Sequence, residues 1–283
     1  MLSSEHLPSL MPIHRPNKVL IELFGEGMCP YTANLSTGTL SPLLQLPGMD
    51  SLVDVDYTPF GNAYYLSTQC GGVRAPAGCD GSTACLYNST TRECWDDACG
   101  REHAEAPAWC LDAEPNCQHG DAECVANQVQ ACAKEAACDP KAVFSLAACM
   151  FGEYLKPQGY RMWPGNATES SVLAVARECA RTTNAPWERI DGCLQSPERR
   201  RSAIRAAARN TPVHEGVPWL MVDGVPVEYD DEPTIADLAD TVCAAASFAA
   251  HEMPAACSAR ALAALRQRQK AKAQSESSVR RTC

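Results

Sequence analysis

The sequence of 283 residues lacks several features that would each point to a class of protein. No stretch reaches the roughly 18 consecutive apolar residues that a membrane-spanning helix needs. No two cysteines have the C-x₂-C spacing that is typical of zinc modules. Acidic residues outnumber basic ones, 34 to 24, and the net charge of −10 argues against a nucleic-acid surface, which needs an excess of Lys and Arg. We therefore expect no transmembrane segment, no metal site and no nucleic-acid partner.

The two ends of the chain lack the patterns of folded segments. Residues 1–18 show neither the apolar segment nor the cleavage site of a secretory signal peptide, and their three prolines interrupt any periodicity, so we predict a disordered arm. Residues 250–283 are basic, because seven Lys or Arg and one acid, Glu276, lie between Arg260 and Arg281. We interpret them as a solvated basic tail, with contact to a membrane surface or a partner as the alternative.

Cysteine, by contrast, is abundant, with 17 residues. So many thiols are typical of oxidising compartments, where they form disulfides. Three N-x-[ST] sequons, at Asn34, Asn88 and Asn166, agree with passage through the secretory pathway and predict glycosylation there. We therefore expect a lysosomal, secreted or other lumenal compartment, although no leader is visible. Because the count is odd, at least one cysteine has no intrachain partner; Cys29 and the terminal Cys283 are the candidates.

The order of the predicted elements indicates an α/β domain over residues 19–249. The apolar run 19–24 predicts a buried strand, a helix is expected over 31–46 with Pro30 in its first turn, and the alternating segment 51–57 predicts a second strand. Strand, helix and strand at this spacing form a right-handed parallel crossover.

The C-terminal part of this domain reads as a hairpin and a helix. Residues 219–222 and 225–229 are apolar runs on either side of Asp223-Gly224, which is a strong hairpin signal, and an amphipathic helix is expected over 233–249. The sum of the two halves is a thioredoxin-like fold with segments inserted in its middle.

Two insertions separate the halves. Residues 61–116 contain six cysteines among Gly, Pro, Ser, Asp and Asn, with little apolar material, so we predict an insertion stapled by disulfides whose pairing stays open. Residues 117–210 show helical patterns and are predicted as an inserted helical block. The expected helices cover 121–137, 140–156, 169–183 and 197–209.

Cys29 is the candidate nucleophile. It follows a buried strand and a glycine-flanked loop, GEGM, and directly precedes a helix. A cysteine at a helix N-terminus has its pKa lowered by the unpaired amides and the helix dipole, and the thiolate is the attacking species. A structural disulfide or an inert buried thiol is the alternative. A dithiol site would have its second cysteine at position 32, where this chain has Thr32.

Pro218 is the second candidate. In thioredoxin-like folds a cis-proline before a hairpin faces the active-site cysteine and leaves a backbone edge for the substrate, so we predict a cis Val217–Pro218 bond. Pro30 and Tyr31 on the cysteine side and Val217 on the proline side are the predicted substrate-binding residues.

One segment resembles the signature of a known family. The stretch CQHGDAECVANQVQAC, residues 117–132, is similar to the signature of the gamma-interferon-inducible lysosomal thiol reductase family. The segments PFGNA (59–63) and HEGVPWLMVDGVP (214–226) extend the resemblance, as do Cys149, Cys179 and Cys193. The matching signature positions are Cys117, Gln118, His119, Gly120, Glu123, Cys124, Asn127 and Cys132.

The resemblance implies a thioredoxin-like fold, reduction of disulfides in unfolding protein substrates, and an acidic endolysosomal or secreted setting. It implies that the signature cysteines anchor disulfides and that His119 is a capping or hydrogen-bonding residue rather than a general base. The 61–116 segment is longer and richer in cysteine than the family leads one to expect.

The departure from the family lies at Thr32, because the family has a C-x-x-C pair there. In a dithiol site the second cysteine attacks the mixed disulfide and frees the product, which Thr32 cannot do. Its hydroxyl could donate to the Cys29 thiolate and lower its pKa. The first hypothesis is therefore a monothiol oxidoreductase with no bound cofactor, which acts on disulfide-containing proteins and uses glutathione or free cysteine as reductant. The second is an impaired member that serves as a binding subunit, with a protein partner at the cysteine-rich insertion or the basic tail.

Overall fold

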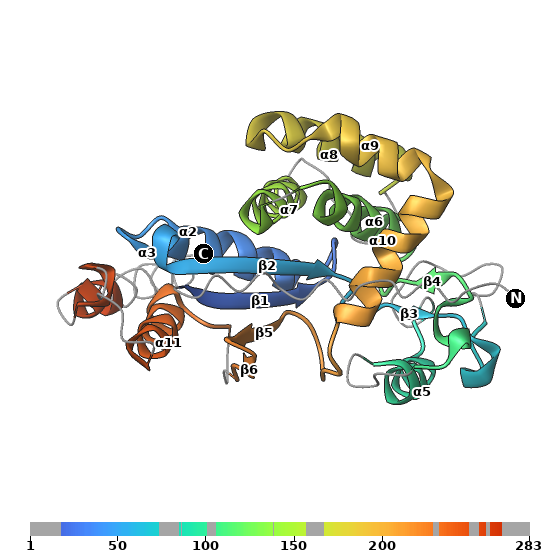
Figure 1. Cartoon of the computed structure of the whole chain (residues 1–283), viewed down its shortest axis with the longest axis horizontal. Helices are drawn as coiled ribbons and strands as arrows, with labels where there is room; N and C mark the ends of the chain where they lie inside the picture. The colour runs from blue at the N-terminus through green and yellow to red at the C-terminus, as the bar shows by residue number, and fades with distance from the viewer. Residues whose placement is uncertain are drawn as a thin grey trace, which may run out of the picture.

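A four-stranded sheet in the order β2-β1-β5-β6 lies at the centre of the fold (Figure 1). β1 (Val19–Gly25) pairs in parallel with β2 (Val53–Pro59), as expected for a strand–helix–strand crossover. β5 (Trp219–Val222) pairs antiparallel with β1, and β6 (Val225–Pro226) pairs antiparallel with β5. Every residue of β1 is buried, because this strand has a neighbour on each side. The arrangement is the thioredoxin-like α/β fold predicted from the sequence.

The register places Ile21 of β1 opposite Val55 of β2 on one side and Val222 of β5 on the other. All three side chains are buried in the central core. The computed structural model describes residues 18–73, 85, 87–100, 106–137, 139–156, 167–228, 232–248, 255–258 and 261–267. Residues 1–17 of the predicted arm (1–18) and most of the basic tail lie outside these residues.

The crossover between β1 and β2 is a segmented helix rather than the continuous one expected over 31–46. It consists of α1 (Pro30–Asn34), a π-helical stretch (Leu35–Leu40) and α2 (Ser41–Leu44). A further turn, α3 (Met49–Leu52), occupies the start of the predicted second strand, so β2 begins at Val53. Gly48, in the left-handed region at φ 84°, precedes this turn. The alternating pattern over 51–57 predicted a strand there and gave no sign of the turn.

The inserted helical block packs against β2. Helices α6 and α7 contact the strand, and α8 and α9 form an outer layer beyond them (Figure 1). Two disulfides, Cys132–Cys193 and Cys149–Cys179, join these layers. The helix α9 (Trp187–Gln195) was not predicted. The others lie close to their predicted bounds: α6 (Asp121–Ala136), α7 (Pro140–Tyr154), α8 (Glu169–Thr183) and α10 (Pro197–Asn210).

The cysteine-rich insertion is more ordered than its composition predicts. It contains a helix, α5 (Ser89–Cys99), which the sequence reading missed, and a two-stranded sheet of β3 (Tyr64–Tyr65) and β4 (Pro115–Asn116). The disulfides Cys70–Cys94 and Cys99–Cys110 hold it, and Cys85 is also disulfide-bonded. The insertion also includes the short 3₁₀ turns Thr68–Cys70 and Ala108–Leu111.

The expectation that this insertion has little core was wrong. Tyr65 and Trp95 are buried and stack on each other, with ring centroids 5.9 Å apart, and both contact the ring of Phe60. Burial of aromatic rings of this size contributes much more to the stability of a core than burial of the small residues that dominate the composition of this segment. The insertion is therefore joined to the central domain by an aromatic cluster as well as by its disulfides.

The C-terminal unit is shorter than predicted at one strand. β6 ends at Pro226, which has no N–H to continue the ladder, and Tyr229 lies outside the described residues. α11 (Ile235–Phe248) packs against α2 and the sheet, and the Cys243–Cys257 disulfide ties the short turn Ala255–Cys257 to it. None of the helices in the described residues has the length and apolar character needed to cross a membrane.

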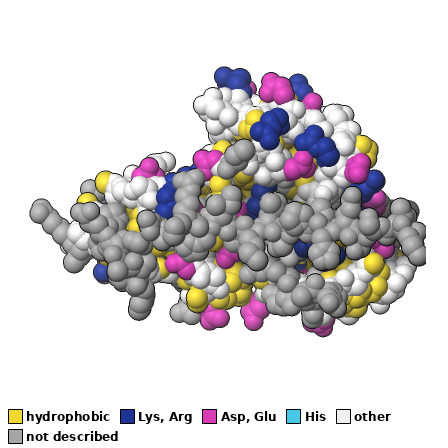
Figure 2. Space-filling view, in the orientation of Figure 1, with side chains coloured by type: hydrophobic (Ala, Val, Ile, Leu, Met, Phe, Trp, Pro, Cys, Tyr) yellow, Lys and Arg dark blue, Asp and Glu magenta, His cyan; other side chains and the backbone are white. Residues whose placement is uncertain are grey.

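Charges of both signs are interspersed on the face drawn in Figure 2, where Lys and Arg side chains alternate with Asp and Glu over the outer helices α8 and α9. Such mixing is typical of a solvated helical surface.

Candidate active site

Cys29 lies at the N-cap of α1, directly after the loop that leaves β1. The loop needs its glycines: a Cβ on Gly25 would lie 2.4 Å from Cγ2 of Thr32, and one on Gly27 would lie 2.6 Å from Cβ of Ala126. The close approach of α6 to the loop at Gly27 is stabilised by Asn127, whose Oδ1 accepts from the Gly27 N–H at 2.7 Å. The signature helix thus fixes the loop that presents Cys29.

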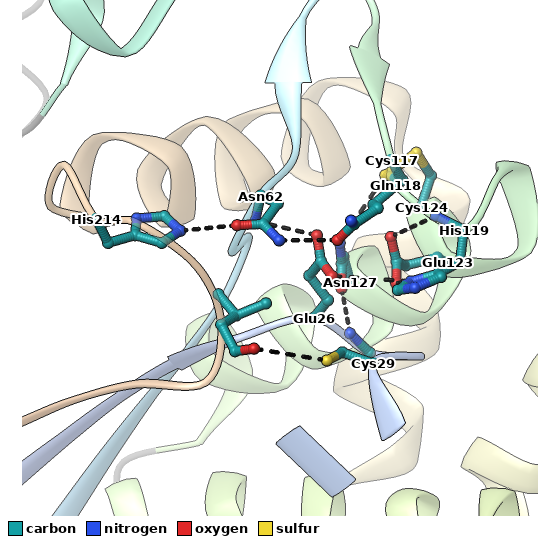
Figure 3. A network of polar contacts seen from close by, with 12 residues as sticks. Glu26, Cys29, Asn62, Cys117, Gln118, His119, Glu123, Cys124, Asn127 and His214 are labelled. Carbon is teal, nitrogen blue, oxygen red and sulfur yellow. Dashed lines mark hydrogen bonds and ion pairs between the residues drawn. A yellow bond between two sulfur atoms is a disulfide. The ribbon is translucent and has the colours of Figure 1, made fainter. Parts of the chain in front are cut away.

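The sulfur of Cys29 faces the predicted proline segment. Sγ lies 3.9 Å from the carbonyl oxygen of Val217, which can accept from the thiol, and the Val217–Pro218 bond is cis (Figure 3). Cys29 is the free cysteine among the described residues, and it is only 4% exposed. Val217 and Pro218 are half-buried, and Tyr31 next to the cysteine is 64% exposed. The structure therefore places the predicted catalytic and substrate-binding residues next to one another, on the surface around Cys29 and Tyr31.

The electrostatics of Cys29 differ from the expectation. Burial, and after it the carboxyl of Glu26, raise the pKa of the thiol to about 11. The N–H and the hydroxyl of Thr32 favour the thiolate and act in the predicted direction, but they are outweighed. The expectation of a lowered pKa was wrong because desolvation was not visible in the sequence.

The signature residues form the wall on the α6 side of the loop. Cys117 bridges Cys124, and Cys132 bridges Cys193, as the resemblance implied for disulfide anchors. Gly120 has φ 88° directly before α6, where a residue with a side chain would be strained.

His119 acts as a hydrogen-bonding residue. Its backbone N–H donates to Oε1 of Glu123 at 3.1 Å, and its Nδ1 lies 2.5 Å from Oε2 of the same carboxyl group. Glu123 is fully buried, so the contacts with His119 offset the cost of its desolvation. The expectation of a capping or hydrogen-bonding histidine agrees with this geometry.

Glu26, three residues before Cys29, is the site residue that sequence reasoning missed. It is fully buried, and its pKa is raised well above the ordinary value because of burial and the neighbouring Glu123. One oxygen accepts from the Asn62 N–H at 3.0 Å. The other lies 3.7 Å from Nδ1 of His119, too far for a hydrogen bond, and has no hydrogen-bond partner among the described residues. The only signal for it was its place inside the glycine-flanked loop.

Glu26, His119 and Glu123 are also the group that could hold a metal ion, since one ligand atom from each lies within 4.8 Å of the others. Two carboxylates and an imidazole suit a divalent cation. However, His119 and Glu123 already satisfy each other at both carboxylate oxygens. A cation would have to displace the proton that joins them.

Asn62 connects the two sides of the site (Figure 3). Its side chain donates to Oε1 of Gln118 at 2.8 Å, and its Oδ1 lies 3.2 Å from Nε2 of His214. His214 lies in the loop that precedes the cis-proline, defined here as the 211–218 loop. Asn62 and His214 belong to the segments PFGNA and HEGVPW, so the sequence indicated these segments but not the contact between them.

Of the predicted glycosylation sites, Asn34 and Asn88 are exposed. Asn88 also caps α5, because its Oδ1 accepts from the Thr91 N–H at 3.0 Å, which leaves its amide nitrogen free of that contact. Asn166 lies outside the described residues.

Comparisons with known proteins agree with this geometry. The family described as "Gamma interferon inducible lysosomal thiol reductase (GILT)" matches residues 20–112 and 98–163, which together cover half of the chain. A protein of Arabidopsis thaliana named "Gamma-interferon-responsive lysosomal thiol protein" is 28% identical over 130 residues, 45% of this chain and 47% of the relative. The chain thus matches about half the length of this curated relative. The family match includes Cys29, Glu26 and the whole 117–132 signature, and the chain therefore belongs to the gamma interferon inducible lysosomal thiol reductase family.

Proposed function

We propose that the protein is a thiol–disulfide oxidoreductase that acts through a single thiol, Cys29, in a lysosomal, secreted or other lumenal compartment. One observation carries the proposal: the free cysteine of the described residues lies at the N-cap of α1 with its sulfur against the carbonyl of Val217 and the cis Pro218. Family membership supports the reaction class, and six described disulfides support the oxidising compartment.

The reaction proceeds by thiol–disulfide exchange. The Cys29 thiolate attacks one sulfur of a substrate disulfide, a bond forms between these two sulfurs, and the other substrate sulfur leaves and takes up a proton. A small external thiol then attacks the sulfur of Cys29, which releases the reduced substrate and leaves the small thiol bound to Cys29. A second small thiol attacks that adduct, so one substrate disulfide and two small thiols give two substrate thiols and one small disulfide.

The residues around Cys29 would divide the remaining tasks. The N–H and hydroxyl of Thr32 favour the thiolate, while the half-buried Val217–Pro218 segment and the exposed Tyr31 would hold an extended substrate chain. Because the pKa of Cys29 is about 11, few molecules hold a thiolate at neutral or acidic pH, so the attack is expected to be slow and to speed up as the pH rises.

The same two observations, 4% exposure and a raised pKa, favour a second candidate function. In that case the protein is a family member that no longer reduces disulfides and serves as a binding subunit in a lumenal or extracellular assembly. The surface around Tyr31 or the cysteine-rich insertion would then be the surface that contacts the partner.

The test is reduction of a denatured disulfide substrate by the purified protein with glutathione or free cysteine, compared with the variant Cys29→Ser. We expect the variant to lose the activity of the protein entirely, because no other described cysteine is free. Equal rates in protein and variant would contradict the enzyme. Alkylation of the native protein over a rising pH series separates the two candidates further: the enzyme predicts labelling of Cys29 in the folded protein that speeds up toward its pKa of about 11, whereas a binding subunit predicts no labelling until the protein is unfolded.

A further inference from the structure

The cysteine-rich insertion reaches into the site through one buried cation. Arg92, on α5, is 8% exposed, and its Nη2 donates to the carbonyl oxygen of His214 at 2.9 Å. The same Nη2 lies 3.0 Å from Nε2 of the His214 ring. The guanidinium is paired at its other side with Asp96, one turn along α5, with Nε and Oδ2 3.0 Å apart. A residue of the insertion thus contacts both the backbone and the ring of the 211–218 loop.

The tautomer of His214 follows from its partners. Nδ1 lies 2.7 Å from the carbonyl oxygen of Pro212, which can only accept, so Nδ1 holds the proton and Nε2 accepts from Arg92. Burial, and after it the positive charge of Arg92, lower the pKa of the imidazole to about 4, so the ring stays neutral and keeps accepting in mildly acidic solution. Arg92 is the charged group that influences this ring directly, and the other close polar neighbour is the neutral amide of Asn62.

Helix α5 has a fixed position from which to hold the loop. Asn88 caps its first turn, and Trp95 is buried and donates its ring N–H to the carbonyl of Cys110 at 2.8 Å. The middle and the C-terminal end of the helix are covalently tied, since Cys94 bridges Cys70 and Cys99 bridges Cys110. Cys94 is only two residues from Arg92, so the Cys70–Cys94 bridge fixes the turn that presents the guanidinium.

The loop in turn lies against the sulfur of Cys29. Val217, whose carbonyl faces Sγ, is three residues after His214, so a shift of His214 moves the group that covers Cys29. Asn62 lies beside the same histidine, with its Oδ1 3.2 Å from Nε2, but both atoms are acceptors in this tautomer, so Arg92 is the donor that holds the ring. The hydrogen bonds of Arg92 therefore connect the insertion to the loop whose Val217 carbonyl lies against the thiol.

We propose that the cysteine-rich insertion is a brace for the 211–218 loop and that Arg92 is its positioning residue. The brace holds the Val217–Pro218 segment over Cys29, keeps the thiol covered in the resting protein and orients the backbone edge to which an extended substrate would add. The role for substrate rests on the proposed function, whereas the covering of Cys29 does not. The insertion is on this account an internal part of the site rather than a surface for a separate partner.

The experiment compares Arg92→Gln with the conservative Arg92→Lys and with Glu93→Gln, a control on the exposed side of the same helix. The first readout is the rate at which iodoacetamide labels Cys29 in the folded protein at one fixed pH. We expect about a tenfold rise for Arg92→Gln, a smaller rise for Arg92→Lys and none for the control, because loss of buried charge-assisted hydrogen bonds frees the loop. Near-ultraviolet circular dichroism shows that each variant is folded.

A second readout separates positioning from general loosening. The pKa of His214, followed by NMR, should rise from about 4 in Arg92→Gln and stay lower in Arg92→Lys, since lysine keeps the charge. With a disulfide substrate, Arg92→Gln should raise KM more than it lowers kcat. Removal of the Cys70–Cys94 bridge by paired Ala substitutions should reproduce the faster labelling, whereas removal of the distant Cys243–Cys257 bridge should not.

Unchanged labelling of Cys29 in folded Arg92→Gln would overturn the brace, and so would equal effects of the two bridge removals. These readouts need no catalytic turnover. If the protein proves inactive on every disulfide substrate, the proposed function fails while the labelling and NMR results still decide whether the brace exists.

Discussion

Two cysteine sites at helix starts lie side by side in this fold, and one has a free thiol while the other forms a disulfide. Cys29 precedes α1 after a glycine-flanked loop and is free, whereas Cys117 and Cys124 flank the start of α6 after Gly120 and are bridged, with their Cα atoms 5.5 Å apart. The local patterns are similar, so position at a helix start does not by itself make a thiol reactive. The difference lies in whether the fold brings a second sulfur within bonding distance, as it does for Cys117 and Cys124.

The comparison also extends to charge. Glu123 on α6 accepts from the N–H of His119 and lies against its ring, and the charges of Glu26 and Glu123 both raise the pKa of Cys29. The bridged site therefore contributes to the electrostatics of the free one. Reactivity at Cys29 is limited by its buried surroundings more than it is assisted by its helix.

The largest expected effect comes from making the free site resemble the bridged one. Thr32→Cys would supply the missing second sulfur, and an intramolecular attack on the mixed disulfide gains an effective concentration far above that of any added thiol. We expect single-turnover reduction of a denatured disulfide substrate, without external thiol, to become at least about 100-fold faster. Thr32→Ser, which keeps a hydroxyl, is the matched control. A mixed disulfide that persists equally long in both variants would show that a thiol at position 32 does not reach the adduct on Cys29.

The next effect sharpens the bridged side of the comparison. The Cys132–Cys193 bridge closes a separation of 61 residues, and the Cys117–Cys124 bridge closes one of 7. Replacing each pair by Ala is expected to lower the free energy of unfolding by about 4 kcal/mol and about 2.5 kcal/mol respectively, because the longer loop gains more entropy when unfolded. Denaturant titration measures both values. Equal losses would mean that local contacts, not loop length, determine the contribution of these bridges.

A pH dependence tests the covered state of the free site. The folded pKa of His214, about 4, lies below the ordinary value of 6.5, so the unfolded chain takes up a proton first as the pH falls. Stability should therefore drop by up to about 3 kcal/mol between pH 6.5 and pH 4 and no further below that from this group. In His214→Gln this part of the pH dependence should be missing. Parallel unfolding curves for protein and variant across the range would contradict the assignment.

The smallest effect concerns the charge next to the free thiol. Glu26→Gln removes a negative charge that raises the pKa of Cys29, so the pKa should fall from about 11 toward the ordinary value of 9. The pH at which alkylation of Cys29 reaches half its maximal rate measures the shift. Glu93→Gln is the control, because the charge of Glu93 is not among the causes of the raised pKa of Cys29. A midpoint that stays in place would show that burial alone sets the pKa.

The sequence predicted the elements that local patterns encode. The strand–loop–cysteine–helix unit, the cis Val217–Pro218 bond and the disulfide role of the signature cysteines were all recovered. It did not reveal α5 or the packing of Trp95 in the insertion, because a single turn-rich segment gives no sign of the aromatic rings that it meets in space. The sign of the pKa shift at Cys29 was missed for the same reason, since burial is a property of the fold.

The six described bridges also differ in how readily a small thiol would reduce them. In the proposed reaction a small thiol is the reductant, and the same thiol can attack the disulfides of the protein itself at a rate that depends on how exposed each bridge is. Cys132 and Cys193 have no exposed surface, so a small thiol cannot approach that bridge without prior opening, whereas Cys70 and Cys94 are both partly exposed. Excess reductant is thus expected to open the Cys70–Cys94 bridge before the Cys132–Cys193 bridge. If the insertion braces the 211–218 loop as proposed, this opening uncovers Cys29 and couples the supply of reductant to the accessibility of the thiol.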